Sequence, residues 1–158
     1  MDDRRDFLRH TLATLAYRGG KTIRDVPNDF AGFHATAGLR TPLDLLGHIG
    51  DLFAWAVTMA EGRTTWPQHV ASDWKEEVKR FFSGLEALDA LLESDRPIGV
   101  EMDRIFQGPI ADALTHIGQL AMLRRMAGSP VRGENYYLAE IVSGRVGPEQ
   151  ADPIREFD

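Results

Sequence analysis

Apolar side chains recur at helical spacing in four long segments of the chain, and this periodicity restricts the possible folds more than any other feature. The segments cover about residues 3–17, 41–60, 72–92 (or from 67) and 110–126. Residues three and four positions apart share one face of an α-helix, so each segment predicts an amphipathic helix. No segment shows a convincing strand pattern. We therefore expect an all-α protein, for which a four-helix bundle is the simplest architecture.

Residues with strong preferences for helix termini mark the ends of these segments. Thr41-Pro42-Leu43-Asp44 offers a capping hydroxyl, a proline at the first helical position and an acid in the first turn. Gly19-Gly20 predicts the end of the first helix, and Gly128-Ser129-Pro130 predicts the end of the fourth. Gln107-Gly108-Pro109 predicts the start of the fourth helix, with a shorter helical piece before it at 103–106.

Two segments fall outside the helical pattern. The connection that ends near Arg40 is rich in Gly, Pro, Asn and Asp. Because it is longer than most connections in compact domains, we expect it to pack over the helices or to have a functional role. The tail, residues 131–158, is expected to be partly irregular, with one short helix near 135–142 and an extended polar stretch after Gly144.

Length and composition narrow the class of protein. The 158 residues fit one domain, taken here as 1–158. Subtracting 24 Asp and Glu from 18 Lys and Arg gives a net charge of −6, which argues against nucleic acid as a partner. The absence of cysteine leaves His, Asp and Glu as the ligands for any metal. No apolar stretch approaches the roughly 20 residues of a membrane span, and the charged N-terminal segment is unlike a secretory signal, so we expect a cytoplasmic protein.

His48, Asp112 and His116 are the residues most capable of chemistry. His48 lies in the apolar stripe Leu45, His48, Leu52, Trp55 and Met59, whose members are three and four residues apart. Asp112 and His116 are four residues apart, so both side chains lie on one face of the fourth helix. Imidazole and carboxylate together suit Zn²⁺, Ni²⁺, Fe²⁺ or Mn²⁺, and three protein ligands leave a position open for water or substrate. The pattern indicates a metal site between two helices.

Other interpretations of these residues stay open. A histidine on an apolar face is often a core residue hydrogen-bonded to a backbone carbonyl, and Asp112 could be a first-turn acid that favours the helix dipole. An Asp–His hydrogen bond without a metal also fits. The charged face of the third helix is expected to be solvated, and Arg124 and Arg125 are expected to complement the dipole of their own helix. The weaker ligand candidates are His10, His34, His69, Glu101, Asp103 and Glu134, the three acids being expected at the surface.

Two sequence motifs resemble those of a known family. The run Leu45-Leu46-Gly47-His48-Ile49-Gly50-Asp51-Leu52, followed by Trp55, is similar to the second helix of the DinB-like (YfiT-like) superfamily. The run Leu114-Thr115-His116-Ile117-Gly118-Gln119-Leu120, continuing to Gly128-Ser129-Pro130, resembles the fourth-helix motif of that superfamily. The fourth-helix motif is the more specific of the two, and the similarity extends from the first helix to Pro130.

The resemblance implies a four-helix bundle with up-down-down-up connectivity and a divalent metal between the helices. Family members commonly bind the ion with one histidine from the second helix and an H-x-x-x-H pair from the fourth. His48 and His116 match two of these positions, and Asp112 takes the place of the first histidine of the pair. The resemblance therefore implies one of two outcomes. Either Asp112 binds the metal together with the two histidines, or the metal is bound weakly or not at all.

The resemblance also implies a class of function. Characterised relatives include transferases and isomerases that use low-molecular-weight thiols such as mycothiol or bacillithiol, and the ion is thought to activate the thiolate. We therefore expect a metal-dependent enzyme with a small-molecule substrate, with Trp55 and aliphatic side chains forming the wall of the pocket. The alternatives are a metal-free module for small-ligand binding or stress response with a degenerate site, and a structural homodimer paired through the third helix.

Overall fold

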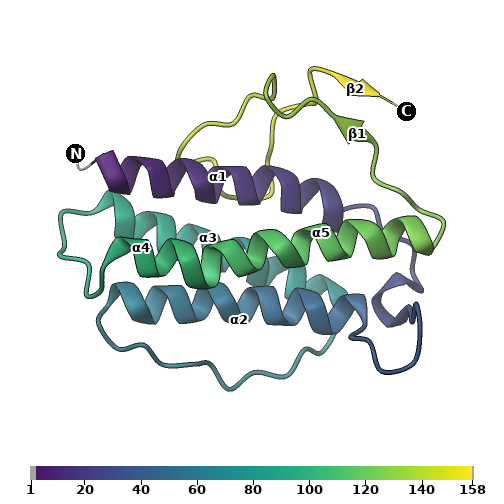
Figure 1. Cartoon of the computed structure of the whole chain (residues 1–158), viewed down its shortest axis with the longest axis horizontal. Coiled ribbons are helices and arrows are strands. Elements are labelled where there is room, and N and C mark those ends of the chain that lie inside the picture. Colours follow the sequence, from purple (N-terminus) through teal and green to yellow (C-terminus); the bar gives the residue numbers. More distant parts are fainter. Residues whose placement is uncertain (1–2, 158) are drawn as a thin grey trace.

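A computed structural model describes residues 3–157 of the chain. Four long helices dominate it: α1 (Asp3–Ile23), α2 (Pro42–Ala60), α3 (Trp74–Glu93) and α5 (Ala111–Met126), the last preceded by the short helix α4 (Met102–Ile105) (Figure 1). The other regular elements described are a 3₁₀ turn, η1 (Phe30–Gly32), a π-helical turn, η2 (Phe106–Ile110), and the two-residue strands β1 (Gly133–Glu134) and β2 (Glu156–Phe157). The all-α prediction is confirmed.

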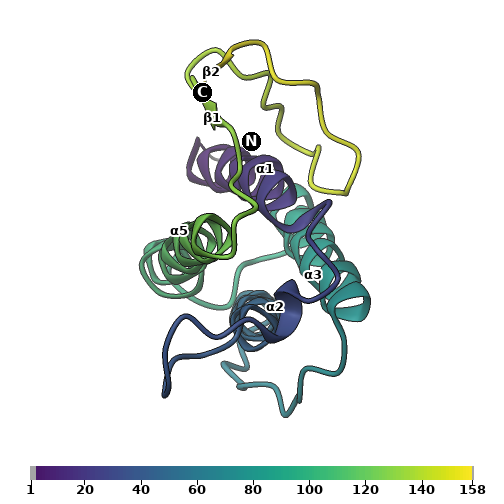
Figure 2. The same cartoon turned by 90° about the vertical axis from the view of Figure 1, so that its right-hand side faces the viewer.

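The long helices lie side by side around one apolar core. Both α1 and α2 contact α3 and α5, and the view along the helices shows the four elements around a common centre (Figure 2). In Figure 1, α1 and α5 run in one direction and α2 and α3 in the other. The side chains buried at the centre include Leu12, Leu15, Leu46, Ile49, Phe53, Phe81, Leu85, Leu88 and Leu120. No helix within residues 3–157 combines the length and the apolarity needed to cross a membrane.

Helix α1 continues through Gly19-Gly20, so the predicted end at these residues is wrong. A Cβ atom on Gly19 would overlap the ring of Phe81 and lie 3.1 Å from Cδ1 of Ile117. The same position on Gly20 would lie 3.4 Å from the Phe82 ring. The two glycines therefore serve close packing of α1 against the aromatic side chains of α3, and this tertiary contact outweighs their low helix propensity.

The fourth helical segment begins earlier than the sequence indicates. Met102 to Met126 form one continuous helical run, in which η2 joins α4 to α5 and Pro109 lies inside the turn. Proline lacks the N–H that an α-helix requires at this point, and a π-helical turn accommodates the interrupted hydrogen-bond ladder. Asp112 consequently lies well inside the run, which weakens its interpretation as a first-turn acid.

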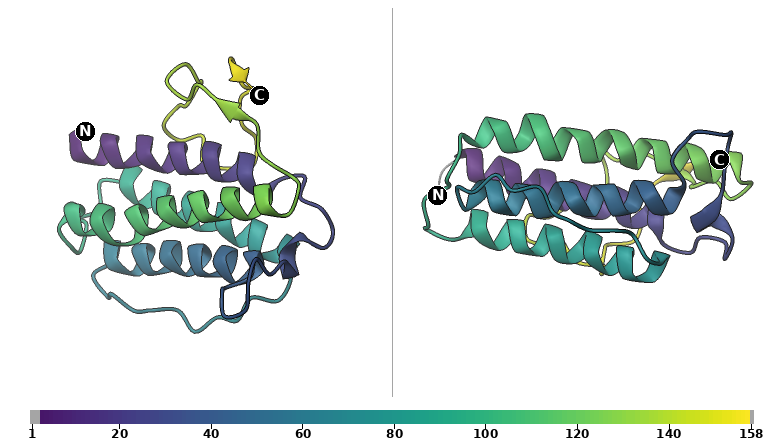
Figure 3. Two further views of the ribbon diagram at one scale, coloured as in Figure 1. Left: turned by 45° about the vertical axis from the view of Figure 1, so that its right-hand side comes forward. Right: turned by 90° about the horizontal axis from the view of Figure 1, so that it is seen from below.

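The starts of α2 and α3 follow from their capping residues. Thr41 and Asp44 form the expected capping box, with Thr41 Oγ1 accepting from the Asp44 N–H at 3.1 Å. Asp73 caps α3 by accepting hydrogen bonds from the N–H groups of Lys75 and Glu76, so α3 starts at Trp74, after both predicted starts. The connecting segment 61–73 has no regular structure and passes along the length of α2 (Figure 3, right).

The long connection after α1 is anchored by an aromatic side chain. Phe30, in η1, is 1% exposed and packs against Trp74, with 5.5 Å between the ring centroids. The indole N–H of Trp74 in turn donates to the Ile23 carbonyl at 3.2 Å. These contacts hold the connection against the ends of α1 and α3, and they place residues 35–40 beside α2.

The tail folds back across α1 (Figure 2), and the helix expected near 135–142 does not form. Strands β1 and β2 pair antiparallel, with Glu134 opposite Glu156. Glu134 is buried, so its expected place at the surface is wrong: its carboxylate accepts from the Tyr17 hydroxyl at 2.6 Å and from Lys21 Nζ at 2.7 Å. The pairing of β1 with β2 holds Gly133 and Glu134 extended, and turns and bends follow where the helix was expected.

Candidate metal centre

Helices α2 and α5 bring the three predicted ligand residues together. His48 is on the side of α2 that faces α5, where its side chain is 21% exposed. Asp112 and His116 occupy successive turns of α5, with side chains 45% and 13% exposed. The two imidazole rings meet edge to face, with 4.9 Å between their centroids. All three predicted residues are therefore in one group that is half-buried and still accessible.

The ligand atoms of this group face a common point. His48 Nε2 lies 3.5 Å from Asp112 Oδ2, and His116 Nε2 lies 3.3 Å from Asp112 Oδ1. All three ligand atoms lie within 4.8 Å of one another, so the group could hold a metal ion. Ligand atoms about 2.0–2.2 Å from a tetrahedral zinc ion are separated by roughly 3.3–3.6 Å. The two His–Asp separations fall in this range, although they run to different oxygens of Asp112, and the 4.8 Å limit means that the third can be wider than in a filled site. The donor chemistry of two imidazoles and a carboxylate suits a divalent cation.

Gln119 fixes the orientation of the His116 ring. Its side-chain oxygen lies 2.8 Å from His116 Nδ1, an arrangement in which Nδ1–H donates to Gln119 Oε1. A neutral imidazole carries one N–H, so this tautomer leaves the lone pair of Nε2 directed toward Asp112 and His48. Such hydrogen bonds to the outer nitrogen of a ligand histidine are usual in metal sites. The sequence analysis did not identify this role of Gln119, although its i, i+3 spacing from His116 was a usable signal.

The surroundings of His48 favour the neutral form of its ring. Burial lowers the pKa of His48, and the positive charge of Arg40 and the neighbouring His116 lower it further against the opposing effect of Asp112. Trp66 stands beside the ring, with 5.7 Å between the centroids, and Trp55 packs against Trp66 at 5.5 Å. A neutral imidazole is the form that binds metals. Trp66 was missed because the segment that carries it has no periodic pattern.

A cleft of about 860 Å³ opens beside the two histidines. Residues 35–40 of the long connection form one wall, and Leu45, Met122 and Met126 form most of the rest. Its volume lies within the range of small-molecule sites. Trp55 lies outside this cleft and lines a smaller hollow with Asp112, so the expected apolar wall is built mainly from other side chains. The long connection therefore lies at the cleft, as would be expected if it has a functional role.

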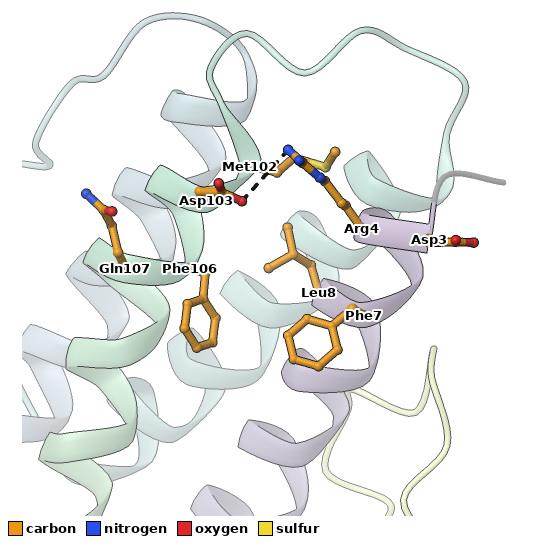
Figure 4. A pocket seen from close by; sticks show the side chains of 8 residues that line it. All are labelled: Asp3, Arg4, Phe7, Leu8, Met102, Asp103, Phe106 and Gln107. Carbon is orange, nitrogen blue, oxygen red and sulfur yellow. Dashed lines mark ion pairs between the residues drawn. The ribbon is translucent and has the colours of Figure 1, made fainter.

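The other ligand candidates lie elsewhere. His10 and His34 are exposed, and so are Glu101 and Asp103. His69 Nε2 lies 2.7 Å from Glu77 Oε1, outside the group formed by His48, Asp112 and His116. Asp103 lies with Arg4, 3.9 Å away, at a hollow near the start of α1, into which the rings of Phe7 and Phe106 also project (Figure 4).

The charged face of α3 is only partly solvated. Lys75, Glu76 and Lys79 are exposed as expected, but Glu77 is 1% exposed and Arg80 is half-buried. The Arg80 guanidinium donates to the Gly47 carbonyl at 2.9 Å and pairs with Asp51 and Glu77. The expectation of a solvated face is wrong for these two residues, because α2 and the segment 61–73 cover that part of α3. Arg80 thereby holds the turn of α2 that carries His48.

Arg124 also has a role beyond its own helix. It is buried, and its guanidinium donates to the carbonyls of Thr22, Arg24 and Ser129 at 2.9–3.0 Å. These oxygens belong to the C-terminal ends of α1 and α5, so one cation satisfies both helix termini.

Comparison with known proteins found no relative of this chain. No protein-family model matches the chain, and no curated protein or solved structure is significantly similar to it.

Proposed function

We propose that this chain is a divalent-metal-dependent enzyme with a small-molecule substrate, built as a four-helix bundle with up-down-down-up connectivity in the manner of the DinB-like superfamily. The opposite directions of the helix pairs α1/α5 and α2/α3 support the connectivity (Figure 1). The single observation that carries the metal is the convergence of His48 Nε2, the Asp112 carboxylate and His116 Nε2 from two separate helices. Such donors within 4.8 Å of one another, beside a cleft, suit an ion with an open coordination position.

The residues of the site have distinct roles in this proposal. His48, Asp112 and His116 would hold the ion, and Gln119 keeps the Nε2 lone pair of His116 available by accepting from Nδ1–H. Arg80 fixes the backbone of α2 at Gly47, next to His48. A bound divalent ion supplies Lewis acidity, which lowers the pKa of a coordinated thiol or water. The apolar walls of the cleft exclude bulk water from the substrate and strengthen the electrostatic interactions inside.

The proposed reaction class is transfer or isomerisation that uses a low-molecular-weight thiol. The cleft is largely apolar, with Leu45, Leu123 and Met126 among its walls, and it is wide enough for a thiol together with a second small molecule. The connection 35–40 closes one side of it. Since the two substrates would share one cleft, the walls would hold the electrophile against the thiol.

The metal content of the purified protein tests the proposal. Protein prepared without an affinity tag and supplied with Zn²⁺, Ni²⁺, Fe²⁺ or Mn²⁺ is expected to retain about one ion per chain, and His116→Ala is expected to lose it because each ligand histidine contributes directly to affinity. His10→Ala is the matched control, since His10 is exposed on α1 away from the site. Less than about 0.1 ion per chain for every metal would contradict the proposal, because a resident site must fill.

The apolar cleft also supports a second candidate function, a metal-free module for small apolar ligands or stress response. Leu39, Met122 and Met126 are each about half exposed at the cleft, and clustered exposed apolar side chains often mark a ligand-binding groove. This candidate predicts that a chelator leaves the melting temperature unchanged and that His116→Ala does not reduce binding of an apolar dye. The metal-dependent proposal predicts that chelation lowers the melting temperature.

We further propose that the chain pairs as a homodimer. The exposed part of α3 and the exposed rings of Phe7 and Phe106 (Figure 4) are the surfaces that support pairing. Light scattering after size-exclusion chromatography decides the point, and a monomer at working concentrations would exclude it.

A further inference from the structure

A second hollow, of about 410 Å³, lies between α1, α5 and the start of the tail. Three arginines line it: Arg18 from α1, Arg125 from α5 and Arg132 from the tail. Among the residues that the structure describes, no acidic side chain belongs to its lining, although the whole chain carries a net charge of −6. Guanidinium groups gathered at one hollow create a local positive potential that favours the binding of an anion.

Two acidic side chains of the tail, Glu134 and Glu156, form hydrogen bonds with other side chains. The Glu134 carboxylate is buried against Lys21 and the Tyr17 hydroxyl, and Glu156 binds Lys21 at 2.7 Å and Arg132 at 3.1 Å. Within residues 3–157 no hydrogen bond or ion pair engages the guanidinium of Arg125. Within the described residues, Arg18 and Arg125 have no carboxylate partner, so they contribute positive charge to the hollow.

The walls of the hollow are held in place. Glu134 ties the segment that contains Arg132 to α1 through its bonds to Tyr17 and Lys21. The ring of Tyr136 forms another wall and lies 4.3 Å from Arg18 Cζ. A cation–π contact of this kind orients the planar guanidinium. A guanidinium oriented in this way is suited to phosphate oxygens, which arginine binds in a bidentate manner.

The hollow has room for a ligand over α5. Gly118 lines it, and a Cβ atom at this position would meet no other atom within 4 Å. At about 100° per residue, Gly118 and Arg125 lie on the face of α5 opposite to His116. The hollow is thus separate from the proposed metal centre, although both use α5.

We infer that this arginine-lined hollow is a binding site for a small phosphorylated ligand, such as a phosphate monoester or a diphosphate. The ligand's phosphate oxygens accept hydrogen bonds from Arg125, Arg18 and Arg132, and Tyr136 and Gly118 border its remaining part. The site takes a compact anion, because its volume of about 410 Å³ suits a phosphate group with a small substituent.

Calorimetric titration with inorganic pyrophosphate tests the inference. The wild-type protein is expected to bind pyrophosphate, with an affinity that falls as sodium chloride is raised. Arg125→Gln is expected to weaken binding at least about tenfold, since it removes a charge-assisted hydrogen bond. Gly118→Leu is expected to abolish binding by filling the hollow while all three arginines remain. Arg104→Gln, which removes an exposed arginine on α4, is the control and is expected to bind as the wild type does.

Two further arms separate the site from its alternatives. In a His116→Ala background, pyrophosphate binding is expected to persist; its loss would place the anion at the metal centre and overturn the inference. A short single-stranded oligonucleotide is expected to bind no more tightly than pyrophosphate. Undetectable pyrophosphate binding, equal binding by Arg125→Gln and the wild type, or binding of the oligonucleotide alone would each overturn it.

Discussion

The two ring nitrogens of His116 have different partners, and this difference makes the role of Gln119 measurable. Gln119→Ala removes the acceptor for Nδ1–H, so the ring is no longer held in the tautomer and orientation that present Nε2 to Asp112. We expect the affinity for Zn²⁺ to fall by roughly 10–100-fold, as is typical when such a supporting hydrogen bond is lost. Competition with a chromophoric chelator measures the affinity.

Gln68→Ala is the control for this prediction. Gln68 is exposed in the segment 61–73, and we expect its loss to leave zinc affinity unchanged. Equal affinities of Gln119→Ala and the wild type would show that Gln119 does not support a ligand.

The lowered pKa of His48 predicts how the site responds to pH. Because burial favours the neutral ring, protons compete for Nε2 only below the ordinary histidine pKa of 6.5. We expect zinc affinity to fall as the pH drops below about 6.5, because protons then compete increasingly with the ion for the imidazole nitrogens. The stability of the metal-free fold should also decrease at low pH. Because the pKa of His48 is lower in the folded protein than in the unfolded chain, its contribution is fully present above the unfolded pKa and is lost as the pH falls through the folded pKa.

Chelator competition between about pH 5 and pH 8 tests this response. An affinity that already declines between pH 8 and pH 7 would contradict a neutral His48 in the folded protein.

At the scale of single helices, Gly19 and Gly118 make opposite predictions for the same substitution. Gly19→Ala introduces a Cβ atom that overlaps the Phe81 ring, and we expect a destabilisation of about 1–3 kcal/mol. Gly118→Ala meets no atom within 4 Å and should stabilise α5 by about 0.5–1 kcal/mol. Urea denaturation measures both. A stabilised Gly19→Ala variant would contradict the close approach of α1 and α3.

The helices differ in how far local sequence determines them. Helix α2 was predictable because the Thr41–Asp44 capping box, Pro42 and the apolar stripe all favour the same start. Gly19-Gly20 and Pro109 misled the prediction, because both are helix breakers by local preference and both lie inside helical segments here. Gly19 is tolerated because α1 packs closely against Phe81, and Pro109 is tolerated because the backbone forms a π-helical turn. Neither effect can be recognised from the local sequence.

At the scale of the whole molecule, one buried ion pair attaches the tail to the helices. The side chains of Lys21 and Glu134 are 6% and 0% exposed. Burial opposes the charge of Lys21, but its hydrogen bonds to Glu134 and Glu156 outweigh burial and raise its pKa. Lys21→Met leaves the Glu134 charge buried without its cation, so we expect a loss of about 3–5 kcal/mol in unfolding free energy.

The exposed ion pair of Arg132 with Glu156 provides the matched control. Arg132→Met should cost less than about 1 kcal/mol, because solvent screens an exposed pair. Since the pKa of Lys21 is raised, the stabilisation by the buried pair should be complete below the unfolded lysine pKa and be lost only as the pH rises through the folded value. Equal effects of the two substitutions in urea denaturation would argue against a tail held by Lys21.

The position of the candidate metal site depends on how the helices pack against one another. The sequence identified His48 and His116 because each lies on a helical apolar face, and the i, i+4 spacing added Asp112. It did not identify Trp66 or Arg80, since an irregular segment and a charged helix face give no signal of what they will contact. Convergence of residues about seventy positions apart is decided by how the helices pack, which a single sequence does not contain.

An anomalous difference map tests the central claim most directly. Crystals of the untagged protein grown with Zn²⁺ would be measured on both sides of the zinc absorption edge. The account predicts a peak between α2 and α5 at about 2.0–2.2 Å from His48 Nε2, an Asp112 oxygen and His116 Nε2. A map without a peak at this point, with both imidazoles hydrogen-bonded to protein groups, would contradict it.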